Sequence, residues 1–246
     1  MVFLSILIGA FVATSCSKDH DIPTGKVFNA DSDGGSSSGT TVSGSYNGHD
    51  YVDLGLPSGT LWATCNVGAN RPEDYGHYFA WGETQPKSDY IWGIYQYCNG
   101  SSNTLTKYCT NASYGYNGFT DNLTVLEASD DAATAQWGSG WRMPTQAELQ
   151  ELLSNTANVW TTQNGVNGRL FTATNGNSLF LPAAGYRRAT ILYKAGTYSY
   201  YWSSSLDTGY PDNAWGLYFD SGYCNVGNYS RFYGQSVRPV RSASKN

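Results

Sequence analysis

The stretch WRMPTQAEL at residues 141–149 constrains the fold more tightly than any other part of the sequence. Thr145 followed three residues later by Glu148 is a capping box, and Pro144 prevents a helix from extending backwards past it. The leucines that follow recur at helical spacing. A short amphipathic helix is therefore predicted from Gln146 to about Ser154. Glu148 is interpreted as the cap, and a catalytic carboxylate at this position is the alternative.

The chain after this helix changes to the pattern of short strands. The segments SLFLPAAGYRR, TYSYYWSSSL and AWGLYFD are rich in β-forming residues and are separated by glycine, proline and asparagine. In the last of them, Trp215, Leu217 and Phe219 alternate with smaller or polar residues. This alternation predicts a strand with one buried face.

Two further elements precede the capped helix. In residues 51–67, two extended runs flank Pro57-Ser58-Gly59, a turn in which proline fixes φ and glycine permits a positive φ, so a β-hairpin is predicted. Residues 130–136 predict a second short helix, with aspartates at the positive end of its dipole. The fold class is therefore α+β, with two short helices among many short, mostly antiparallel strands.

The N-terminus is typical of an exported lipoprotein. Residues 2–13 form an apolar run that is too short to span a membrane and is typical of a signal peptide. Small residues lead from it into Cys16, as in the lipobox of bacterial lipoproteins, and residues 17–21 resemble the acidic surface-export signal of Bacteroidota. Cys16 is therefore predicted to carry a lipid anchor. A cleaved secretory peptide with an incidental cysteine is the alternative.

These features divide the chain into three predicted parts. Residues 1–16 are the signal peptide with its lipobox, and residues 17–48 are the export signal followed by a flexible glycine- and serine-rich tether. Residues 49–242 are enough for one domain with a substantial core. The predicted location is the cell outer membrane, facing the exterior, with the lipid anchor as the only contact with the membrane.

Composition and charge argue against several classes of function. The net charge is −5 and no basic stripe is present, so nucleic acid is not expected as a partner. Of three histidines, His20 and His49 fall in or beside the tether. The chain has no Gly-x-Ser-x-Gly motif and no glycine-rich phosphate loop. Neither an enzyme nor a cofactor is therefore expected.

Six blocks occur in one order along the chain and carry a family resemblance. They are YVDLGLPSGTLWATCNVGA, DYGHYFAWGE, DDAA with WG and then WRMPT, LPAAGYR, YWSSS and SVRPVR. Over about residues 49–241, they resemble the Fibrobacter-type major paralogous domain found in many Bacteroidota lipoproteins. That domain is similar to the C-type-lectin-like fold of formylglycine-generating enzymes and of variable receptor-binding proteins. The resemblance therefore implies a C-type-lectin-like domain.

The resemblance also implies which segments form the scaffold. The first and last strands would pair, YWSSS and SVRPVR would be scaffold strands, and the segment between them would be a long display region on one face. Three tryptophans would be core or platform residues, and two arginines would be buried partners in ion pairs or hydrogen bonds. With the helix cap included, the predicted structural residues are Trp141, Arg142, Thr145, Glu148, Trp202, Trp215 and Arg238.

Two activities of relatives with this fold lack their residues here. Formylglycine-generating enzymes use a pair of nearby cysteines, whereas only Cys224 lies in the C-terminal part of this chain, so such an enzyme is the least favoured hypothesis. The sugar-binding tripeptides of calcium-dependent lectins are absent, and Pro211-Asp212-Asn213 is the nearest match. No metal ligands are assigned, and the need for calcium stays open.

Four cysteines follow the predicted lipid cysteine, at Cys65, Cys98, Cys109 and Cys224. The cell envelope permits disulfides, and four cysteines allow three connectivities among which the sequence does not choose. A disulfide between Cys98 and Cys109, which are close in sequence, is one hypothesis.

Residues 207–233 are dominated by tyrosine, serine, glycine and asparagine, as antibody paratopes are. Tyrosine supplies large, rigid contact area at low entropic cost, so a ligand-binding face is predicted here. An ordinary polar surface loop is the alternative. The candidate ligand-binding residues are Asp207, Tyr210, Asp212, Asn213, Tyr218, Tyr223, Asn225, Asn228, Tyr229, Phe232 and Tyr233.

Within this segment, residues 221–233 show no helix or strand periodicity and lack glutamate, lysine, methionine, glutamine and tryptophan. These five types cannot arise when the adenines of AAC or AAT codons are randomised, as diversity-generating retroelements do in some relatives of the fold. Genetic diversification of 207–233 is therefore a hypothesis, and it stays open.

The predicted function is that of a surface-anchored lipoprotein that binds a protein or glycan ligand, or mediates adhesion, through this face. A structural component of the cell envelope or of a pilus, without a small ligand, is the alternative.

Overall fold

The computed structural model describes residues 39–243 of the chain. The helices are α1 (Ala132–Trp137) and α2 (Gln146–Asn155), and short 3-10 turns lie at Trp92–Ile94, Tyr116–Gly118 and Ala128–Asp130. The strands are β1 (Gly44–Tyr46), β2 (His49–Asp53), β3 (Thr60–Ala63), β4 (Thr156–Gln163), β5 (Val166–Ala173), β6 (Ser178–Pro182), β7 (Tyr186–Arg188), β8 (Ile191–Tyr193), β9 (Ser199–Leu206), β10 (Asn213–Phe219), β11 (Cys224–Ser230) and β12 (Val240–Ser242).

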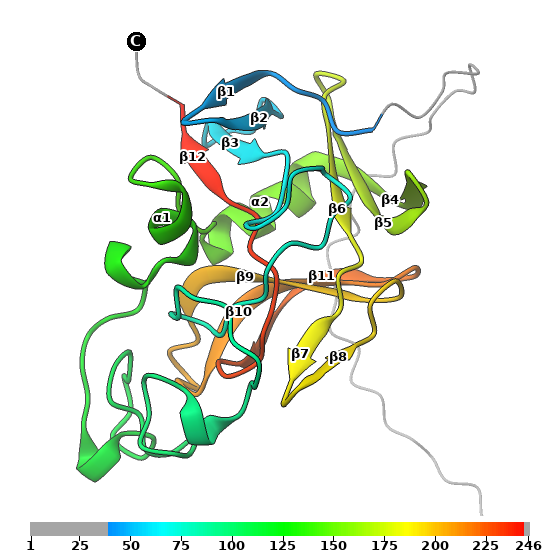
Figure 1. Ribbon diagram of the computed structural model, residues 1–246. Coiled ribbons are helices and arrows are strands. Elements are labelled where there is room, and N and C mark those ends of the chain that lie inside the picture. The colour runs from blue at the N-terminus through cyan, green and yellow to red at the C-terminus, as the bar shows by residue number, and fades with distance from the viewer. Residues whose placement is uncertain (1–38, 244–246) are drawn as a thin grey trace, which may run out of the picture. The chain divides into compact units, whose positions relative to one another are not determined.

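The strands form several small antiparallel sheets (Figure 1). One sheet has the order β1-β2-β3-β12, a second has the order β11-β10-β9, a third has the order β4-β5-β6, and β7 pairs with β8. Within residues 39–243, the predicted architecture of two short helices among short, mostly antiparallel strands is confirmed.

The first sheet contains the hairpin predicted around Pro57-Ser58-Gly59. Strand β2 pairs with β3, and Gly59 in the turn has a φ of 71°. The last strand, β12, also joins this sheet and lies beside β3, with Val240 opposite Trp62 (Figure 1). The expectation that the first and last strands pair with each other is wrong in detail, because β1 adds to the far edge of the sheet through β2.

The tether predicted over residues 17–48 ends earlier than expected. The Thr41 N–H donates to the Ser178 carbonyl at 2.8 Å, and the Thr40 hydroxyl accepts from the Phe180 N–H at 2.9 Å. Hydrogen bonds to the backbone of β6 hold this segment, although its composition offers little apolar area, so composition alone does not reveal that it is ordered. The rest of the predicted tether, the signal peptide and Cys16 lie outside the described residues.

Helix α2 begins at the predicted residue and carries the predicted capping box. The Thr145 side chain accepts from the Glu148 N–H at 3.2 Å, and the Glu148 carboxylate accepts from the Thr145 N–H at 2.8 Å. Arg142 donates to both oxygens of the same carboxylate, at 2.5 and 2.7 Å, and the Thr60 hydroxyl donates to it at 2.8 Å. Because its oxygens are occupied in this way, Glu148 ties the start of α2 to β3.

Glu148 makes the stability of the domain depend on pH. Burial raises the pKa of its carboxyl, but hydrogen bonds from Arg142 and Thr145 outweigh burial and lower the pKa from 4.5 to about 2. The stabilisation is therefore complete above about pH 4.5 and is lost as the pH falls through about 2. We expect the free energy of unfolding to fall by ~3 kcal/mol more in the wild type than in Glu148→Gln between about pH 6 and pH 2. Urea unfolding at both pH values checks this, and equal losses in the two proteins would contradict it.

Helix α1 begins at Ala132, slightly later than the predicted range of 130–136. Asp131 is its N-cap, and the carboxylate accepts from the N–H groups of Thr134 and Met143 at 2.9 and 2.8 Å. The second of these bonds connects the start of α1 to the segment that leads into α2.

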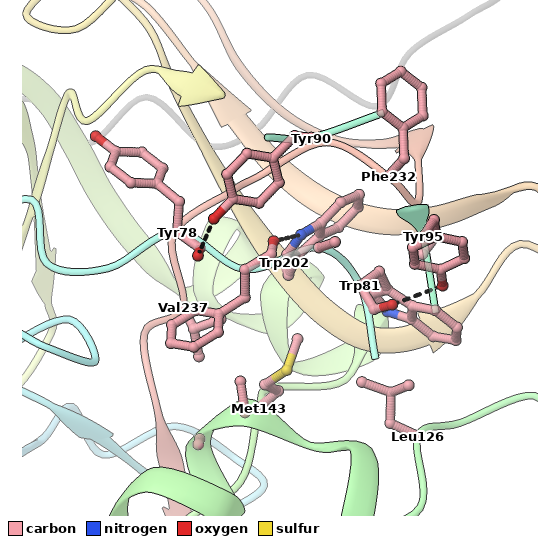
Figure 2. Close-up of a cluster of buried hydrophobic side chains, with 14 of the residues drawn as sticks. Tyr78, Trp81, Tyr90, Tyr95, Leu126, Met143, Trp202, Phe232 and Val237 are labelled. Atoms are coloured by element: carbon pink, nitrogen blue, oxygen red, sulfur yellow. Dashed lines mark hydrogen bonds between the residues drawn. The ribbon is translucent and has the colours of Figure 1, made fainter. Parts of the chain in front are cut away.

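Two clusters of buried side chains hold the sheets together. The first joins α2 to β2 and β3, to β5 and β6, and to one side of β9 and β10. The second joins the loops between β3 and α1 to the other side of β9 (Figure 2). The Trp202 indole N–H donates to the Phe79 carbonyl at 2.8 Å. In Figure 2, the Tyr95 hydroxyl donates to the Trp81 carbonyl at 2.7 Å. The β9–β10–β11 sheet thus has buried residues on both sides.

The tryptophans and Arg238 among the residues predicted to be structural lie in or next to these clusters, whereas Arg142, predicted to be buried, is only half-buried and pairs with Glu148. Trp141 and Trp202 are buried, and Trp215 is half-buried. Arg238 is also buried, and it donates to the side-chain oxygen of Asn66 at 2.9 Å and to surrounding backbone carbonyls. Its partners are neutral oxygens, so it is held by hydrogen bonds rather than by an ion pair.

Candidate ligand-binding face

The sheet of β9, β10 and β11 has two different sides. Directly opposite residues of antiparallel strands share a side, so the pairing of Leu217 with both Tyr201 and Val226 places these three residues together. That side packs against the cluster that contains α2. Tyr218 pairs with Tyr200 and Asn225, and these residues define the other side.

Tyrosine rings cover part of this other side. The ring centroids of Tyr200 and Tyr218 lie 5.1 Å apart, Tyr229 lies 5.0 Å from Tyr200, and Tyr223 lies 6.1 Å from Tyr218. The β7–β8 hairpin extends the cluster, because Tyr186 lies 5.0 Å from Tyr200. We call this set the tyrosine face, and its members are Tyr186, Tyr193, Tyr198, Tyr200, Tyr218, Tyr223, Tyr229 and Tyr233.

Two glycines make room for the ring of Tyr229. Gly216 and Gly227 lie opposite each other on β10 and β11. A Cβ atom at Gly227 would lie 2.8 Å from the Tyr229 hydroxyl, and one at Gly216 would lie 3.4 Å from its ring and 2.7 Å from the Tyr201 carbonyl. Residues without side chains at these two positions therefore allow Tyr229 to pack against the sheet and against the edge of Tyr200.

The tyrosine face is partly open to solvent. Tyr223 is 55% exposed, and the tyrosines that surround it on the sheet are half-buried. Each of these rings packs against neighbouring rings, and part of its surface remains accessible to solvent. Such rings offer apolar contact area and a hydroxyl group with little rotamer freedom left to lose on binding.

Burial raises the pKa values of four phenols of the tyrosine face. Burial raises the pKa of Tyr200 to about 12 and also raises the pKa values of Tyr186, Tyr218 and Tyr229. The Tyr218 hydroxyl donates to the Asp220 carboxylate at 2.5 Å, and this hydrogen bond lowers the pKa of Asp220. These four side chains therefore present neutral hydroxyl groups, and the Asp220 carboxylate lies beside Tyr218.

The structure brings some of the predicted binding residues together on this face. Tyr218, Tyr223, Tyr229 and Tyr233 belong to the tyrosine face, and Asn225 lies exposed on β11 beside Tyr218.

Other predicted binding residues lie away from it. Those in the loop between β9 and β10, or at the start of β10, are Asp207, Tyr210, Asp212 and Asn213. The buried Asp207 carboxylate accepts from the Gly209 N–H at 2.9 Å and from the Asn228 side-chain amide. Asn228 follows Gly227 on β11 and so projects from the opposite side of the sheet. Asp207 and Asn228 thus connect the loop to β11.

The end of the predicted binding segment belongs to the core. Phe232 is buried, and Arg231 is 0% exposed. Arg231 donates to the Tyr95 hydroxyl at 2.8 Å and to the Tyr108 carbonyl at 3.0 Å, and its guanidinium lies 4.9 Å from the Trp81 ring centroid. Sequence reasoning did not single out Arg231, because an arginine among polar residues carries no local sign of burial.

The segment without sequence periodicity, 221–233, contains a regular strand. Residues 224–230 form β11, which pairs with β10 over its whole length. Because β11 is an edge strand and none of its residues is fully buried, the apolar alternation that marks a half-buried strand is weak.

Sequence reasoning also missed the tyrosines outside 207–233. Tyr198 and Tyr200 alternate within TYSYYWSSSL, which is the pattern of two side chains on the same side of a strand. Tyr186 and Tyr193 lie opposite each other across the β7–β8 hairpin. The alternation could have placed the first two together, but their proximity to β10 depends on strand register.

The four cysteines among the described residues are free thiols, so the structure does not contain the hypothesised disulfide. The Cys98 thiol donates to the Trp92 carbonyl at 3.1 Å, and the Cys109 thiol donates to the Asn111 carbonyl at 3.2 Å. Although Cys98 and Cys109 are close in sequence, each thiol donates to a carbonyl of its own loop, and no disulfide joins them. Burial raises the pKa of Cys224 to about 12, which keeps this thiol protonated.

Residues 39–243 contain no group of three or more histidine, cysteine, aspartate or glutamate side chains that could hold a metal ion. In the same range, none of the helices combines the length and the apolar character needed to cross a membrane.

Comparison with known proteins gives one match. The model of a family described as the Lcl C-terminal domain matches residues 57–241, which include the tyrosine face and its scaffold. Neither the curated proteins nor the solved structures include a match to the chain.

Proposed function

The chain belongs to the Lcl C-terminal domain family, and on that premise we propose that it is a surface-anchored lipoprotein that binds a protein or glycan, or mediates adhesion, through its tyrosine face. The proposal includes a C-type-lectin-like domain of the Bacteroidota type, an outer-membrane location and an N-terminal lipid anchor at Cys16. We propose neither a catalytic activity nor a bound cofactor for this chain.

The observation that supports binding is the continuity of the tyrosine face. Rings from the β7–β8 hairpin, from β9, from β10 and from the turn after β10 contact one another at centroid distances of 5.0 to 6.1 Å, although separate segments of the chain supply them. Aromatic rings gathered on an accessible surface are enriched at binding sites because they bury large areas at low entropic cost. A chain that needed only a soluble surface would not have to place them side by side.

The scaffold beneath the face supports the same proposal. Trp202 is buried beside Tyr200 on the same side of β9, and Arg231 is buried at the turn that follows β11. Both donate hydrogen bonds to backbone carbonyls, and Arg231 also donates to the Tyr95 hydroxyl. A binding surface on rigid elements loses little free energy to ordering when a ligand binds.

Probing protein and glycan arrays with the full chain tests the proposed function. We expect at least one protein or glycan to bind above background. Complete silence on both arrays would contradict the ligand-binding proposal and favour the structural alternative, an envelope or pilus-associated component.

The anchor has its own test. Cys16→Ser is expected to release the protein from the membrane fraction, because the apolar run at residues 2–13 is too short to hold a chain in a bilayer once the lipid is absent. Fractionation with a lipid label checks this. If the wild type incorporates no label and the variant stays in the membrane pellet, the lipoprotein proposal is wrong.

Genetic diversification is proposed only for part of 207–233. A position tolerates randomisation when its side chain does not hold the fold, which fits exposed residues such as Tyr223 and Asn225. Arg231 and Phe232 do not fit, since both are buried. Sequencing the locus tests the hypothesis. The absence of a reverse transcriptase gene and of a near-copy that differs at adenines would reject it.

A further inference from the structure

Strand β11 has an outer edge to which nothing pairs in the described part of the chain. The sheet order is β11-β10-β9, so β11 and β9 are the two edges. The outer edge of β9 is covered by bridges from Val125, Gly185 and Ser236 to residues of that strand. No strand or bridge within residues 39–243 covers β11 in the same way.

The hydrogen bonds at the two ends of β11 show which of its backbone groups point outward. The Arg231 N–H donates to the Asp212 carbonyl at 3.0 Å, and the Asp220 N–H donates to the Tyr223 carbonyl at 2.9 Å. Bonded and non-bonded pairs alternate along antiparallel strands. The register therefore turns the backbone groups of Asn225, Gly227 and Tyr229 toward β10 and those of Cys224, Val226 and Asn228 away from it.

This edge lacks the usual protection against pairing. Exposed edge strands commonly carry a charged residue, a proline or a bulge that prevents another strand from adding. Residues 224–230, CNVGNYS, contain neither a charge nor a proline, and their pairing with β10 runs without a register shift. The outward N–H and C=O groups of Cys224, Val226 and Asn228 are therefore available to another extended chain.

The charge around this sheet selects the kind of chain. Residues 199–230 contain Asp207, Asp212 and Asp220 but no lysine, arginine or histidine. The nearest following cation, Arg231, is buried and hydrogen-bonded within the core. The β7–β8 hairpin, which carries basic residues, contacts the sheet on the side of β9, away from β11. Arg169 of β5 reaches this end of the sheet, but it is buried and donates to the Asp220 carbonyl at 3.0 and 3.2 Å. Asp207 is also buried, so the accessible charge beside the start of the free edge is the half-exposed Asp220 carboxylate.

We propose that an extended, lysine- or arginine-containing segment of a partner protein adds to the outer edge of β11. This rests on the proposed function, and it narrows the ligand from a protein or glycan to a basic protein segment. In an added antiparallel strand, residues whose backbone bonds to Val226 share its side of the sheet, and the alternate side chains continue the tyrosine face beside Asn225 and Tyr229. Cationic side chains there lie near aromatic rings and near Asp220.

The probe is a seven-residue peptide of alternating lysine and valine, titrated into the full chain and followed by fluorescence anisotropy. We expect it to bind, and to bind at least about tenfold more weakly when the salt concentration rises from about 0.05 M to 0.5 M. The matching peptide of alternating glutamate and valine is expected not to bind. Equal binding of the two peptides, or binding of neither, would overturn the proposal.

N-methylated versions of the basic peptide test edge pairing without altering the protein. With the lysines on the side of the tyrosine face, the valine N–H groups point to β11 in an antiparallel addition. Methylation of the valine nitrogens is therefore expected to abolish binding, whereas methylation of the lysine nitrogens is expected to preserve it. Equal effects of the two modifications would show that the peptide does not pair with the edge.

A matched pair of variants tests the charge. Asp220→Asn is expected to weaken binding of the basic peptide several-fold, whereas Asp53→Asn in β2, with the same change of charge, is expected to leave it unchanged. Equal effects in the two variants would contradict a local role of Asp220.

The outcome is separable from that of the proposed function. If array ligands bind in a manner that depends on the tyrosine face while the two methylated peptides behave alike, the proposed function stands and the edge proposal fails. If the methylated peptides differ as expected while array binding ignores the tyrosines, the edge binds a ligand and the proposed role of the tyrosine face fails.

Discussion

Replacing Arg231 with alanine is expected to lower the free energy of unfolding by ~4 kcal/mol. The guanidinium donates to the Tyr95 hydroxyl at 2.8 Å and to the carbonyls of Tyr108, Pro211 and Lys107 at 2.9 to 3.1 Å. Truncation would leave these buried acceptors without a donor and would open a cavity against the Trp81 ring. Urea unfolding at neutral pH measures the effect.

Two control variants distinguish the loss of the Arg231 hydrogen-bond network from a loss of charge or of side-chain volume. Arg231→Lys is expected to recover little of the loss, because one ammonium group does not reproduce the planar fork of a guanidinium. Arg188→Ala removes the same side chain from an exposed position in β7 and is expected to change the free energy of unfolding by less than ~0.5 kcal/mol. A loss below ~1 kcal/mol in Arg231→Ala would show that the network does not hold the fold.

Trp202→Ala is expected to cost ~3–5 kcal/mol, the range for a buried aromatic deletion. Trp202 is 0% exposed, and its indole N–H donates to the Phe79 carbonyl at 2.8 Å, so the variant loses both packing and a buried hydrogen bond. Tyr223→Ala on the tyrosine face is expected to stay within ~1 kcal/mol, because Tyr223 is 55% exposed. Denaturant melts of both variants decide the matter, and equal losses would refute the division into scaffold and binding face.

Tyr229 differs from Tyr223 in this respect. Its ring packs over Gly216 and Gly227 and against Tyr200, and it is half-buried. Its replacement by alanine is therefore a poor test of binding alone. The exposed end of the tyrosine face, near Tyr223, separates binding from stability better.

Local signals in the sequence predicted the elements that are fixed locally. The capping box of Thr145 and Glu148 defines the start of α2 through contacts within a few residues, and the Pro57-Ser58-Gly59 turn defines the β2–β3 hairpin in the same way. Such signals need no knowledge of the rest of the chain.

The tyrosine face could be predicted only in part because it is assembled from distant segments. Tyr200 meets Tyr218 only through the register of β9 on β10, and Tyr186 meets Tyr200 only through the position of the β7–β8 hairpin. A compositional window over 207–233 found the tyrosines of β10 and β11 but did not find their partners. It also included Asp207 and Arg231, whose burial depends on loops far away in the sequence.

The central claim is that the tyrosine face binds the ligand, and affinity measurements on a double variant test it most directly. For a ligand found on the arrays, Tyr218→Ala with Tyr223→Ala is expected to bind at least about tenfold more weakly than the wild type. Tyr116→Ala, which removes a tyrosine of 42% exposure outside the tyrosine face, is expected to bind within about twofold of it. Undiminished binding by a folded double variant would contradict the claim.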